Sequence, residues 1–565
     1  MHENYANIWE AVARRRPEWT AIVAGKERID YGTFDDRARR FAASLTARGV
    51  GRGDRVAFYL HNSAEFLVSF YACLKLEAIP VALNYRYRAG EAFELVLAST
   101  PKVIIYKRSS RDVVAELQRL TDDAEHSPST WVEVDDSAVA TAPDARGPNH
   151  AVDFSEMLSA ERTATSRASG DGELYMFTGG TTGAPKAVVW TIGELLQIQQ
   201  SSTYPLIGVE PPRSFEEAAR IATDEDVRHV ITLPLAPFIH ATALFMSMNT
   251  LSIGGTVVIN PNPSLDPAAA ADLAIEQNVT QLVVAGDAVA LPIIGALEQH
   301  PARADIALTS VLSSGMRFSD DVKRRFHQLK QLRIIDILAS SEGGPFAMGI
   351  TTSVSDLPTR LALTAEAVVL DGQNHEVQGT VGASGVLAYK GPLPRGYLND
   401  PKKSAESYPV INGIRHVRPG DYVKVLEGGY VEFLGRGSAV INTGGEKVYP
   451  AEVEERLLDF SGVYDAAVFG LPDERLGEKI AAVVAVRNDA NVTVKDLQDW
   501  VGKELAGYKK PRTISIRASL DRSPAGKLNL SHAKELASAT GEADVREVET
   551  DSAPDESRQE VQRRS

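Results

Sequence analysis

Apolar positions recur along the chain at two spacings, and their alternation predicts helices between short buried strands. Ile8 and Val12, and later Phe41 and Leu45, are spaced as on one face of an α-helix. Continuous apolar runs predict buried strands at 55–60, 102–106, 229–233, 256–259, 281–285 and 310–313. Strands that alternate with helices are typical of parallel sheets with crossover helices, so we predict an α/β body.

The pattern changes in the last third of the chain. After about residue 379, short β-like runs at 385–388 and 430–434 are separated by glycine and proline, which predicts a small β unit. Beyond residue 435, the spacing predicts a small α+β domain with a helix at 451–458, strands at 465–469 and 480–486, and a helix at 494–505. We therefore predict a large N-terminal domain over 1–435 and a small C-terminal domain over 436–540.

Length and composition support a globular protein of more than one unit. At 565 residues the chain exceeds the size at which a single core stops growing, and its hydrophobic share of 44% and charged share of 24% are near globular averages. No segment approaches the roughly 20 apolar residues of a membrane-spanning helix. Arg14, Arg15 and Arg16 interrupt the apolar stretch that a secretory signal needs. We expect a soluble, cytoplasmic protein with no membrane span.

Charge and cysteine content exclude several classes of protein. The formal net charge of -15 argues against a general nucleic-acid binder, which needs a basic face. The single cysteine, Cys73, excludes an internal disulfide framework, and its apolar surroundings predict a buried packing role rather than a nucleophile. Residues 541–565 contain eight acidic and four basic residues with few apolar ones, so we predict a disordered acidic tail.

One segment, residues 175–186, predicts a phosphate-binding loop. Its glycines let the backbone turn tightly and present N–H groups to an anion, its hydroxyls add donors, and Lys186 adds a positive charge. The loop residues expected to contact phosphate are Thr178, Gly179, Gly180, Thr181, Thr182 and Gly183. The string differs from the nucleotide-hydrolase P-loop, which requires G-x-x-x-x-G-K-[ST].

This string resembles the signature of the adenylate-forming superfamily, which includes acyl-CoA synthetases, luciferases and peptide-synthetase adenylation domains. Further similar segments lie at 81–87, 391–397 and 435–450, and the resemblance runs from about residue 9 to 536. The chain is most similar to bacterial fatty-acyl and steroid- or terpenoid-side-chain acyl-CoA synthetases. The resemblance implies an AMP-forming ligase that activates a hydrophobic carboxylic acid as its adenylate and transfers the acyl group to coenzyme A. ATP, Mg²⁺ and coenzyme A are the implied co-substrates.

The resemblance also implies roles for residues far from the loop. Glu342 matches the magnesium-associated glutamate, and a hard cation that bridges phosphates suits a carboxylate. His240 matches the position beside the acyl carboxylate and the incoming thiol. Asp421 matches the carboxylate that binds the ribose hydroxyls, and Arg436 is expected near the phosphates. Lys527 matches the C-terminal lysine that stabilises charge in the adenylation step.

Two further groups complete the implied site. The residues expected to border the nucleotide are Gly315, Leu338, Ala339, Ser340 and Ser341. In the second half-reaction the C-terminal domain is expected to rotate about a hinge near 435–438, which removes Lys527 from the site. The residues that it then brings to the pantetheine channel are Gly444, Gly445 and Glu446.

The sequence departs from the family pattern in three places. Leu338 and Ala339 stand where relatives commonly have an aromatic residue and glycine, Ala187 replaces the glycine after the loop lysine, and His240 is followed by Ala-Thr-Ala. Loss of base stacking is expected to weaken nucleotide binding. Two alternatives therefore stay open beside the two-step ligase. One is a transfer-only ligase that accepts an acyl-adenylate from a partner enzyme, and the other is a non-catalytic scaffold that binds acyl nucleotides.

The acid is predicted only as a class. His240 and residues 242–248 are expected to line its pocket, and their apolar character favours a bulky hydrophobic acid of lipid or terpenoid metabolism. Fatty, steroid-like and terpenoid acids all fit this description. Relatives are often dimers, so the resemblance allows a homodimer.

Overall fold

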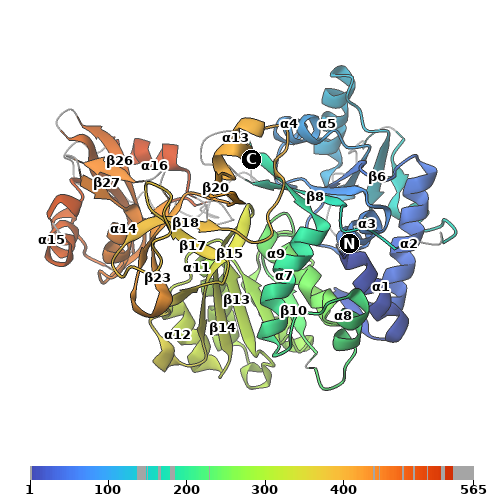
Figure 1. Cartoon of the computed structure of the whole chain (residues 1–565), viewed down its shortest axis with the longest axis horizontal. Helices are drawn as coiled ribbons and strands as arrows, with labels where there is room; N and C mark the ends of the chain where they lie inside the picture. Colours follow the sequence, from blue (N-terminus) through green and yellow to red (C-terminus); the bar gives the residue numbers. More distant parts are fainter. Residues whose placement is uncertain are drawn as a thin grey trace, which may run out of the picture. The chain divides into compact units, whose positions relative to one another are not determined.

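The computed structural model describes residues 3–136, 148, 150–162, 167–178, 185–227, 229–436, 440–443, 446–473, 476–487, 490–505, 507–522 and 528–538. The chain divides near residue 438 into two compact units (Figure 1). The first is the predicted α/β body and the second is a small α+β unit, so the predicted fold class is confirmed.

The first unit contains an eight-stranded sheet in the order β19-β9-β8-β4-β3-β5-β6-β7. Its strands are β3 (Arg55–Tyr59), β4 (Ile79–Ala82), β5 (Val103–Lys107), β6 (Thr130–Val134), β7 (Val152–Asp153), β8 (Glu173–Thr178), β9 (Lys186–Thr191) and β19 (Gly396–Tyr397). The strands from β8 to β7 are parallel, whereas β9 runs antiparallel to β8 and β19 antiparallel to β9. The predicted phosphate loop therefore connects two hydrogen-bonded neighbours.

A second sheet of 13 strands has the order β17-β18-β22-β23-β16-β15-β14-β13-β12-β10-β11-β1-β2. Its parallel part and the edge strand β2 consist of β1 (Thr20–Ala24), β2 (Glu27–Asp30), β10 (Ile231–Pro234), β11 (Thr256–Ile259), β12 (Gln281–Val284), β13 (Ser310–Ser314) and β14 (Arg333–Ser340). Its antiparallel part consists of β15 (Gly343–Thr351), β16 (Leu361–Leu363), β17 (Ala367–Leu370), β18 (Ser384–Tyr389), β22 (Asp421–Val425) and β23 (Tyr430–Arg436).

The strands predicted as a separate small β unit belong to this second sheet. Pairing of β16 with both β15 and β23 joins them to the parallel strands. Only the short hairpin of β20 (Val410–Ile411) and β21 (Ile414–Arg415) forms a sheet of its own among the described residues of this region. The antiparallel β14–β15 pair makes this connection, because it turns the chain back along the edge of the parallel strands.

Helices cover both sheets. Those of the first unit are α1 (Tyr5–Arg15), α2 (Tyr31–Ala47), α3 (Ala64–Leu76), α4 (Ala89–Ser99), α5 (Arg111–Asp123), α6 (Phe154–Met157), α7 (Ile192–Leu206), α8 (Phe215–Ala222), α9 (Ala241–Ser252), α10 (Pro267–Glu276), α11 (Gly286–Gln299), α12 (Asp320–Leu329) and α13 (Pro401–Ser407). Several begin where the sequence supplies an N-cap: the Ser63 hydroxyl accepts from Phe66 N at 3.3 Å at the start of α3, and Thr191 caps α7.

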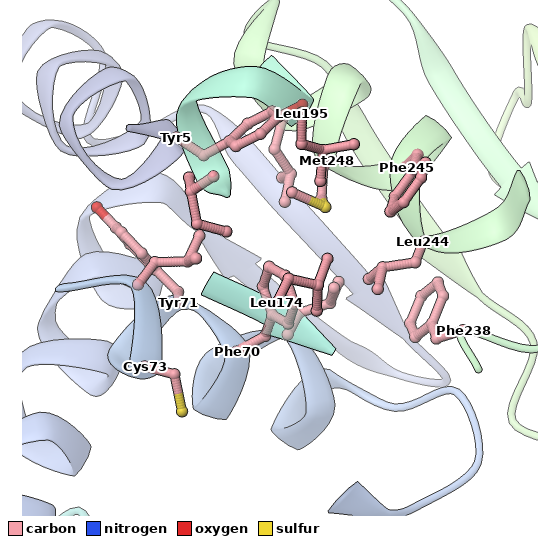
Figure 2. Close-up of a cluster of buried hydrophobic side chains, with 14 of the residues drawn as sticks. Tyr5, Phe70, Tyr71, Cys73, Leu174, Leu195, Phe238, Leu244, Phe245 and Met248 are labelled. Carbon is pink, nitrogen blue, oxygen red and sulfur yellow. The ribbon is translucent and has the colours of Figure 1, made fainter. Parts of the chain in front are cut away.

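The largest hydrophobic core lies where α1, α3, α7 and α9 meet the strand β8. Figure 2 shows side chains from these elements converging, among them Tyr5, Phe70, Leu195 and Met248, all buried. Cys73 on α3 belongs to this core and is fully buried, and burial raises the pKa of its thiol. The predicted packing role of Cys73 is confirmed, since a buried thiol with a raised pKa is a poor nucleophile.

The second unit packs helices against one five-stranded sheet. Its elements are β24 (Ile441–Thr443), β25 (Glu446–Val448), α14 (Pro450–Leu458), β26 (Val463–Asp473), β27 (Gly477–Val486), α15 (Val494–Glu504), β28 (Thr513–Arg517) and α16 (Leu530–Ser538). Hydrophobic clusters lie on both faces of the sheet, with α14 and α15 on one and α16 on the other. Across both units, no described helix is long and apolar enough to span a membrane.

Candidate active site

The predicted phosphate loop leaves β8 at Thr178 and returns into β9 at Lys186. These two residues face each other as Cα partners in the antiparallel register. The predicted phosphate contacts that lie outside the described residues are Gly179, Gly180, Thr181, Thr182 and Gly183. The structure thus places both ends of the loop, and Lys186 stands at its exit.

Lys186 is held by a carboxylate that the sequence pattern did not identify. Its Nζ lies 2.6 Å from Oδ2 of Asp400, and Oδ1 of Asp400 accepts from Lys403 N at 2.9 Å, which caps α13. The hydrogen bond from Lys186 holds the pKa of Asp400 below its ordinary value. The lysine side chain is 42% exposed, so the ammonium group is oriented yet free to exchange Asp400 for an anion.

The turn that carries Glu342 is fixed by three hydrogen bonds from aromatic side chains. Tyr397 Oη donates to Glu342 Oε1 at 3.0 Å, and Tyr408 Oη donates to the Glu342 carbonyl at 3.3 Å. Trp190 Nε1 donates to the Ser341 carbonyl at 2.9 Å. Trp190 and Tyr397 lie on the paired strands β9 and β19, so the strand that begins at Lys186 also positions Glu342. The site residues Lys186 and Glu342 therefore share one support.

Tyr408 is the one of these three donors that lies outside the strands, and it is buried. Its ring packs edge-on against Tyr397 with centroids 6.0 Å apart, and the Arg415 guanidinium lies 4.6 Å from its centroid. Burial, and then the nearby charge of Glu342, raise the pKa of the Tyr408 hydroxyl well above its ordinary value. The hydroxyl therefore stays protonated and acts as a donor.

The glycine pair after Glu342 is required by its positive φ angles and by the side chains packed against it. Gly343 has φ of +157° and Gly344 has φ of +96°. A Cβ atom on Gly343 would lie 2.7 Å from Val417 Cγ1, and one on Gly344 would lie 2.8 Å from the Phe346 ring. Only glycine lets the turn reverse in this space, so the Glu-Gly-Gly string follows from the geometry.

The carboxyl ends of β13 and β14 and the start of α9 carry the next group of predicted residues. Gly315 follows β13 with φ of +86°, and a Cβ atom there would lie 4.0 Å from Thr242 Oγ1. His240 is the N-cap residue of α9, half-buried, and Leu244 N donates to its carbonyl at 3.2 Å. Parallel strands place their carboxyl ends at one edge, the edge where α/β sheets bind ligands.

Ser340, at the end of β14, has a buried hydroxyl without a partner. Its Oγ makes no hydrogen bond within the described residues, and it stands next to Ser341 in the predicted nucleotide segment. A buried polar atom normally has a partner, so this hydroxyl is suited to a ligand.

Two departures from the family pattern are accommodated by packing. Ala187 is 2% exposed and packs in a hydrophobic cluster behind β9 with Val189 and Tyr175. Leu338 lies opposite Ala347 in β15 and packs against the main core, next to Ala339 in the same strand. The added methyl group of Ala187 therefore lies in the core behind the strand.

Asp421 and Arg436 are brought together by the β22–β23 pair. They are Cα partners at the ends of the two strands, and Asp421 is 5% exposed. The side chain of Arg436 lies outside what the structure describes.

The predicted residues of the second unit are described only in part. Glu446 opens β25 opposite Thr443, but its side chain, like Gly444, Gly445 and Lys527, lies outside the described part of the chain. Their contribution to the site stays a prediction.

A cavity of about 370 Å³ lies in the first unit between α7, α9 and the parallel strands. Its lining includes Leu206 of α7, Met246 of α9, Leu312 of β13 and Ile335 of β14. Met246 belongs to the segment predicted to line the acid pocket, whereas His240 is not among the lining residues. α9 and β13 therefore run from the edge that carries His240 and Gly315 to this cavity.

The described residues contain no cluster of three or more histidine, cysteine, aspartate or glutamate side chains that could hold a metal ion. Glu342 offers one carboxylate, whose Oε2 has no hydrogen-bond partner among those residues. Mg²⁺ commonly binds through one or two carboxylates together with substrate phosphates and waters, so this single ligand fits it.

Sequence reasoning missed four residues of this arrangement: Trp190, Asp400, Tyr397 and Tyr408. Tyr397 closes the family-like segment 391–397, and that was the one available signal. The others are recognisable only from their contacts with Ser341, Lys186 and Glu342.

Comparisons with known proteins identify the family of the chain. The model of the family described as AMP-binding enzyme matches residues 9–398, and that of the AMP-binding enzyme C-terminal domain matches residues 452–527. The chain is 34% identical over 548 residues to the medium/long-chain-fatty-acid–CoA/3-oxocholest-4-en-26-oate–CoA ligase of Mycolicibacterium smegmatis, covering 95% of this chain and 97% of that one. It is 32% identical to the 3-oxocholest-4-en-26-oate–CoA ligase of Rhodococcus rhodochrous, covering 95% and 96%.

Among solved structures, the fold is similar to ATP-bound MatB from Rhodopseudomonas palustris. The TM-score is 0.75 at 23% identity, with 95% of this chain and 99% of that chain covered. At this identity the likeness concerns the fold.

Proposed function

The chain belongs to the AMP-binding enzyme family, and from this premise we propose that it is an AMP-forming acyl-CoA ligase for a hydrophobic carboxylic acid. The observation that carries the proposal is the shared support of Lys186 and Glu342 by β9, β19 and the β14–β15 turn. The relatives named as fatty-acid and steroid-acid CoA ligases cover nearly the whole chain, which supports ATP and coenzyme A as its co-substrates.

In the first half-reaction we expect the loop and Lys186 to hold the phosphates of ATP. A carboxylate oxygen of the acid attacks the α-phosphorus, the bond from that phosphorus to the bridging oxygen breaks, and pyrophosphate leaves. The attack concentrates negative charge around the α-phosphate, and Lys186 and Lys527 are the proposed cations that stabilise it. Ser340 and Asp421 are proposed to bind the nucleoside.

Glu342 would hold a Mg²⁺ ion, which when bound supplies positive charge to the phosphate oxygens. Tyr397 positions that carboxylate by donating to Oε1, which leaves Oε2 for the ion. Trp190 and Tyr408, which donate to the backbone carbonyls of Ser341 and Glu342, keep the turn in place while the nucleotide binds and leaves.

In the second half-reaction the sulfur of coenzyme A attacks the acyl carbonyl carbon, the carbon–oxygen bond to phosphate breaks, and AMP leaves. The thiol proton passes to solvent. We propose that the second unit turns about residues 435–438 between the steps and then presents Gly444, Gly445 and Glu446. The division of the chain near residue 438 supports a hinge at this position.

We propose that both half-reactions occur, in preference to transfer alone. The substitutions that suggested poor adenylation are Ala187, which packs into the core, and Leu338, which packs against it. Neither displaces Lys186 from Asp400 or Glu342 from Tyr397. A homodimer and a cytoplasmic location stay predictions from the sequence.

Three separate assays on the purified full chain test the proposal, with fatty, steroid and terpenoid acids as substrates. Pyrophosphate release, acyl-adenylate formation and acyl-CoA formation are measured with ATP, Mg²⁺ and coenzyme A. All three products are expected. Thioester only from supplied acyl-adenylate would replace the proposal by the transfer-only ligase, and no turnover with any acid would leave the acyl-nucleotide-binding scaffold.

A further inference from the structure

We propose that the acid activated by this enzyme carries a hydrogen-bond-accepting oxygen at the end remote from its carboxyl group, and that Arg333 binds this oxygen. A ketone and a second carboxylate share this chemistry. The inference rests on the proposed ligase function and narrows its substrate class. It starts from the cavity of about 370 Å³ between α7, α9 and the parallel sheet.

Two rows of side chains cross the sheet on the side that faces this cavity. Adjacent parallel strands place residues in register, and residues two apart on a strand share a face. The row at the amino ends of the strands is polar and consists of Thr232, Gln281, Ser310 and Arg333. The next row toward the carboxyl ends is apolar and consists of Pro234, Val283, Leu312 and Ile335. The cavity therefore has an apolar middle and a polar far end.

The polar row is already joined by hydrogen bonds, except at its last member. Ser310 Oγ donates to Gln281 Oε1 at 3.3 Å, and Gln281 Nε2 donates to Thr232 Oγ1 at 3.2 Å. Arg333 follows Ser310 in the row, but its guanidinium has no hydrogen bond or ion pair with any residue that the structure describes.

The surroundings of Arg333 favour an oxygen ligand. The side chain is half-buried at the cavity, and none of the residues that line the cavity is acidic. A cation removed in part from water and left without a counterion is unfavourable unless a ligand supplies an acceptor. Its planar fork donates to a carboxylate through two hydrogen bonds and to a ketone through one.

The position of Arg333 relative to the reaction centre fits a long acid. Its Cα partner Ser310 lies five residues before Gly315 along β13, which is about 17 Å at the rise of an extended strand. Met246 of α9, a helix that begins next to His240, and Leu312 of β13, three residues before Gly315, both line the cavity. An acid with its carboxyl group near His240 and Gly315 would thus cross the apolar row and end at Arg333.

The same arrangement should discriminate acids that carry a remote oxygen from acids that lack it. A site built to hydrogen-bond an oxygen rejects an analogue without it more strongly than an apolar pocket rejects a missing methylene group. We therefore expect kcat/KM to be higher for acids with a remote oxygen than for plain acids of equal length, chiefly through KM.

The test compares α,ω-dicarboxylic acids and acids with a remote ketone against unsubstituted acids of the same length. Acyl-CoA formation is measured for the native chain and for Arg333→Met and Arg333→Lys. Arg333→Met should lower kcat/KM for the oxygenated acids at least tenfold, through a higher KM. For the plain acids, kcat/KM should stay the same or rise. Arg333→Lys should restore part of the affinity for the dicarboxylic acid, because it keeps the charge. If Arg333→Met lowered kcat/KM more for the dicarboxylic acid than for the keto acid, a second carboxylate would be the preferred ligand.

Arg324→Met is the matched control, because Arg324 pairs with Asp321 on α12 and does not line the cavity. Arg324→Met should leave kcat/KM unchanged for both the oxygenated and the plain acids. Activity with the plain acid, together with the melting temperature, reports on folding of Arg333→Met. If Arg333→Met lowered kcat/KM equally for both classes of acid, or for neither, the assignment of Arg333 would be overturned while the ligase function stayed intact. Absence of acyl-CoA from every acid with the native chain would instead overturn the proposed function, and this inference with it.

Discussion

The strands β13 and β14 carry different chemistry at their two ends. At the carboxyl ends, Gly315 follows β13, and Ser340 ends β14 just before the turn of Glu342. The carboxylate of Glu342 and the backbone of this turn receive hydrogen bonds from aromatic donors. At the amino ends, Ser310 and Arg333 close a polar row, and the Arg333 guanidinium has no hydrogen bond or ion pair with the described residues. The carboxyl edge is the one proposed to bind the nucleotide. The amino edge is the one proposed to bind the remote oxygen of the acid.

This contrast supports the proposal that one sheet serves two kinds of recognition. Chemistry at the carboxyl edge depends on exact placement of charge, which several hydrogen bonds enforce. Selection of the acid at the amino edge is proposed to depend on the Arg333 guanidinium and on the shape of the cavity. Perturbations at the two edges should therefore separate into effects on adenylation and effects on the choice of acid.

The largest effect is expected from Glu342→Gln. The amide keeps the shape and can still accept from Tyr397, but it removes the negative charge proposed to hold Mg²⁺. Loss of such an electrostatic contribution costs about 3 kcal/mol, or roughly a hundredfold in rate. Pyrophosphate release at saturating acid should fall by this factor for every acid tested. Glu406→Gln, at an exposed position of α13, is the control and should not change the rate of pyrophosphate release. An unchanged rate in Glu342→Gln would show that Glu342 is not part of the proposed site.

Tyr397→Phe should have the next largest effect at the same edge. It deletes the hydrogen bond to Oε1 of Glu342, and a hydrogen bond to a charged group contributes about 1.5 kcal/mol, or roughly tenfold in rate. The Mg²⁺ concentration that gives half-maximal pyrophosphate release should rise. Tyr408→Phe is the matched control, because its hydroxyl contacts the backbone carbonyl of the same residue. It should lower the melting temperature without moving the Mg²⁺ dependence; identical behaviour of the two variants would mean that Tyr397 only stabilises the fold.

Met246→Trp should act at the other edge and change only the choice of acid. The indole would fill part of the cavity lined by Met246, Leu312 and Ile335. We expect kcat/KM for long acids to fall about tenfold, with short acids unaffected, since one pocket contact separates substrates by about 1–3 kcal/mol. Ser201→Trp adds the same ring on the exposed side of α7 and should leave kcat/KM unchanged for acids of every length. A uniform loss over all chain lengths would show that the cavity does not receive the acid.

The smallest effect is expected from Ser340→Ala. Because the buried Oγ lacks a partner within the described residues, its removal should not lower the melting temperature. If the hydroxyl binds the nucleotide, KM for ATP should rise about threefold, which corresponds to about 0.7 kcal/mol. Ser44→Ala is the contrasting control: its hydroxyl donates to the Met157 carbonyl at 2.7 Å, so it should lower the melting temperature and leave KM unchanged. A lower melting temperature in Ser340→Ala would indicate a structural hydroxyl.

Much of the fold was predictable from local patterns. The strands expected at 256–259 and 281–285 are β11 and β12, and the helix expected at 494–505 is α15, because alternation and helical spacing reflect the side of each element that is buried. Membership of the adenylate-forming superfamily is confirmed by the family match. The domain boundary at 435 and the roles of Lys527, Gly444, Gly445 and Glu446 stay predictions.

The sequence by itself predicted which residues would bind phosphate, since the loop with Lys186 and the Glu342 segment are continuous strings whose residue types suffice to indicate an anion site. Only the tertiary structure decided what holds and extends that site. Asp400 meets Lys186 across 214 residues, and Tyr397 meets Glu342 across 55. The polar row joins Thr232 to Gln281 across 49 residues, because crossover helices return parallel strands to the same register. Such neighbours leave no pattern in the chain, since their spacing depends on the lengths of the intervening helices and loops.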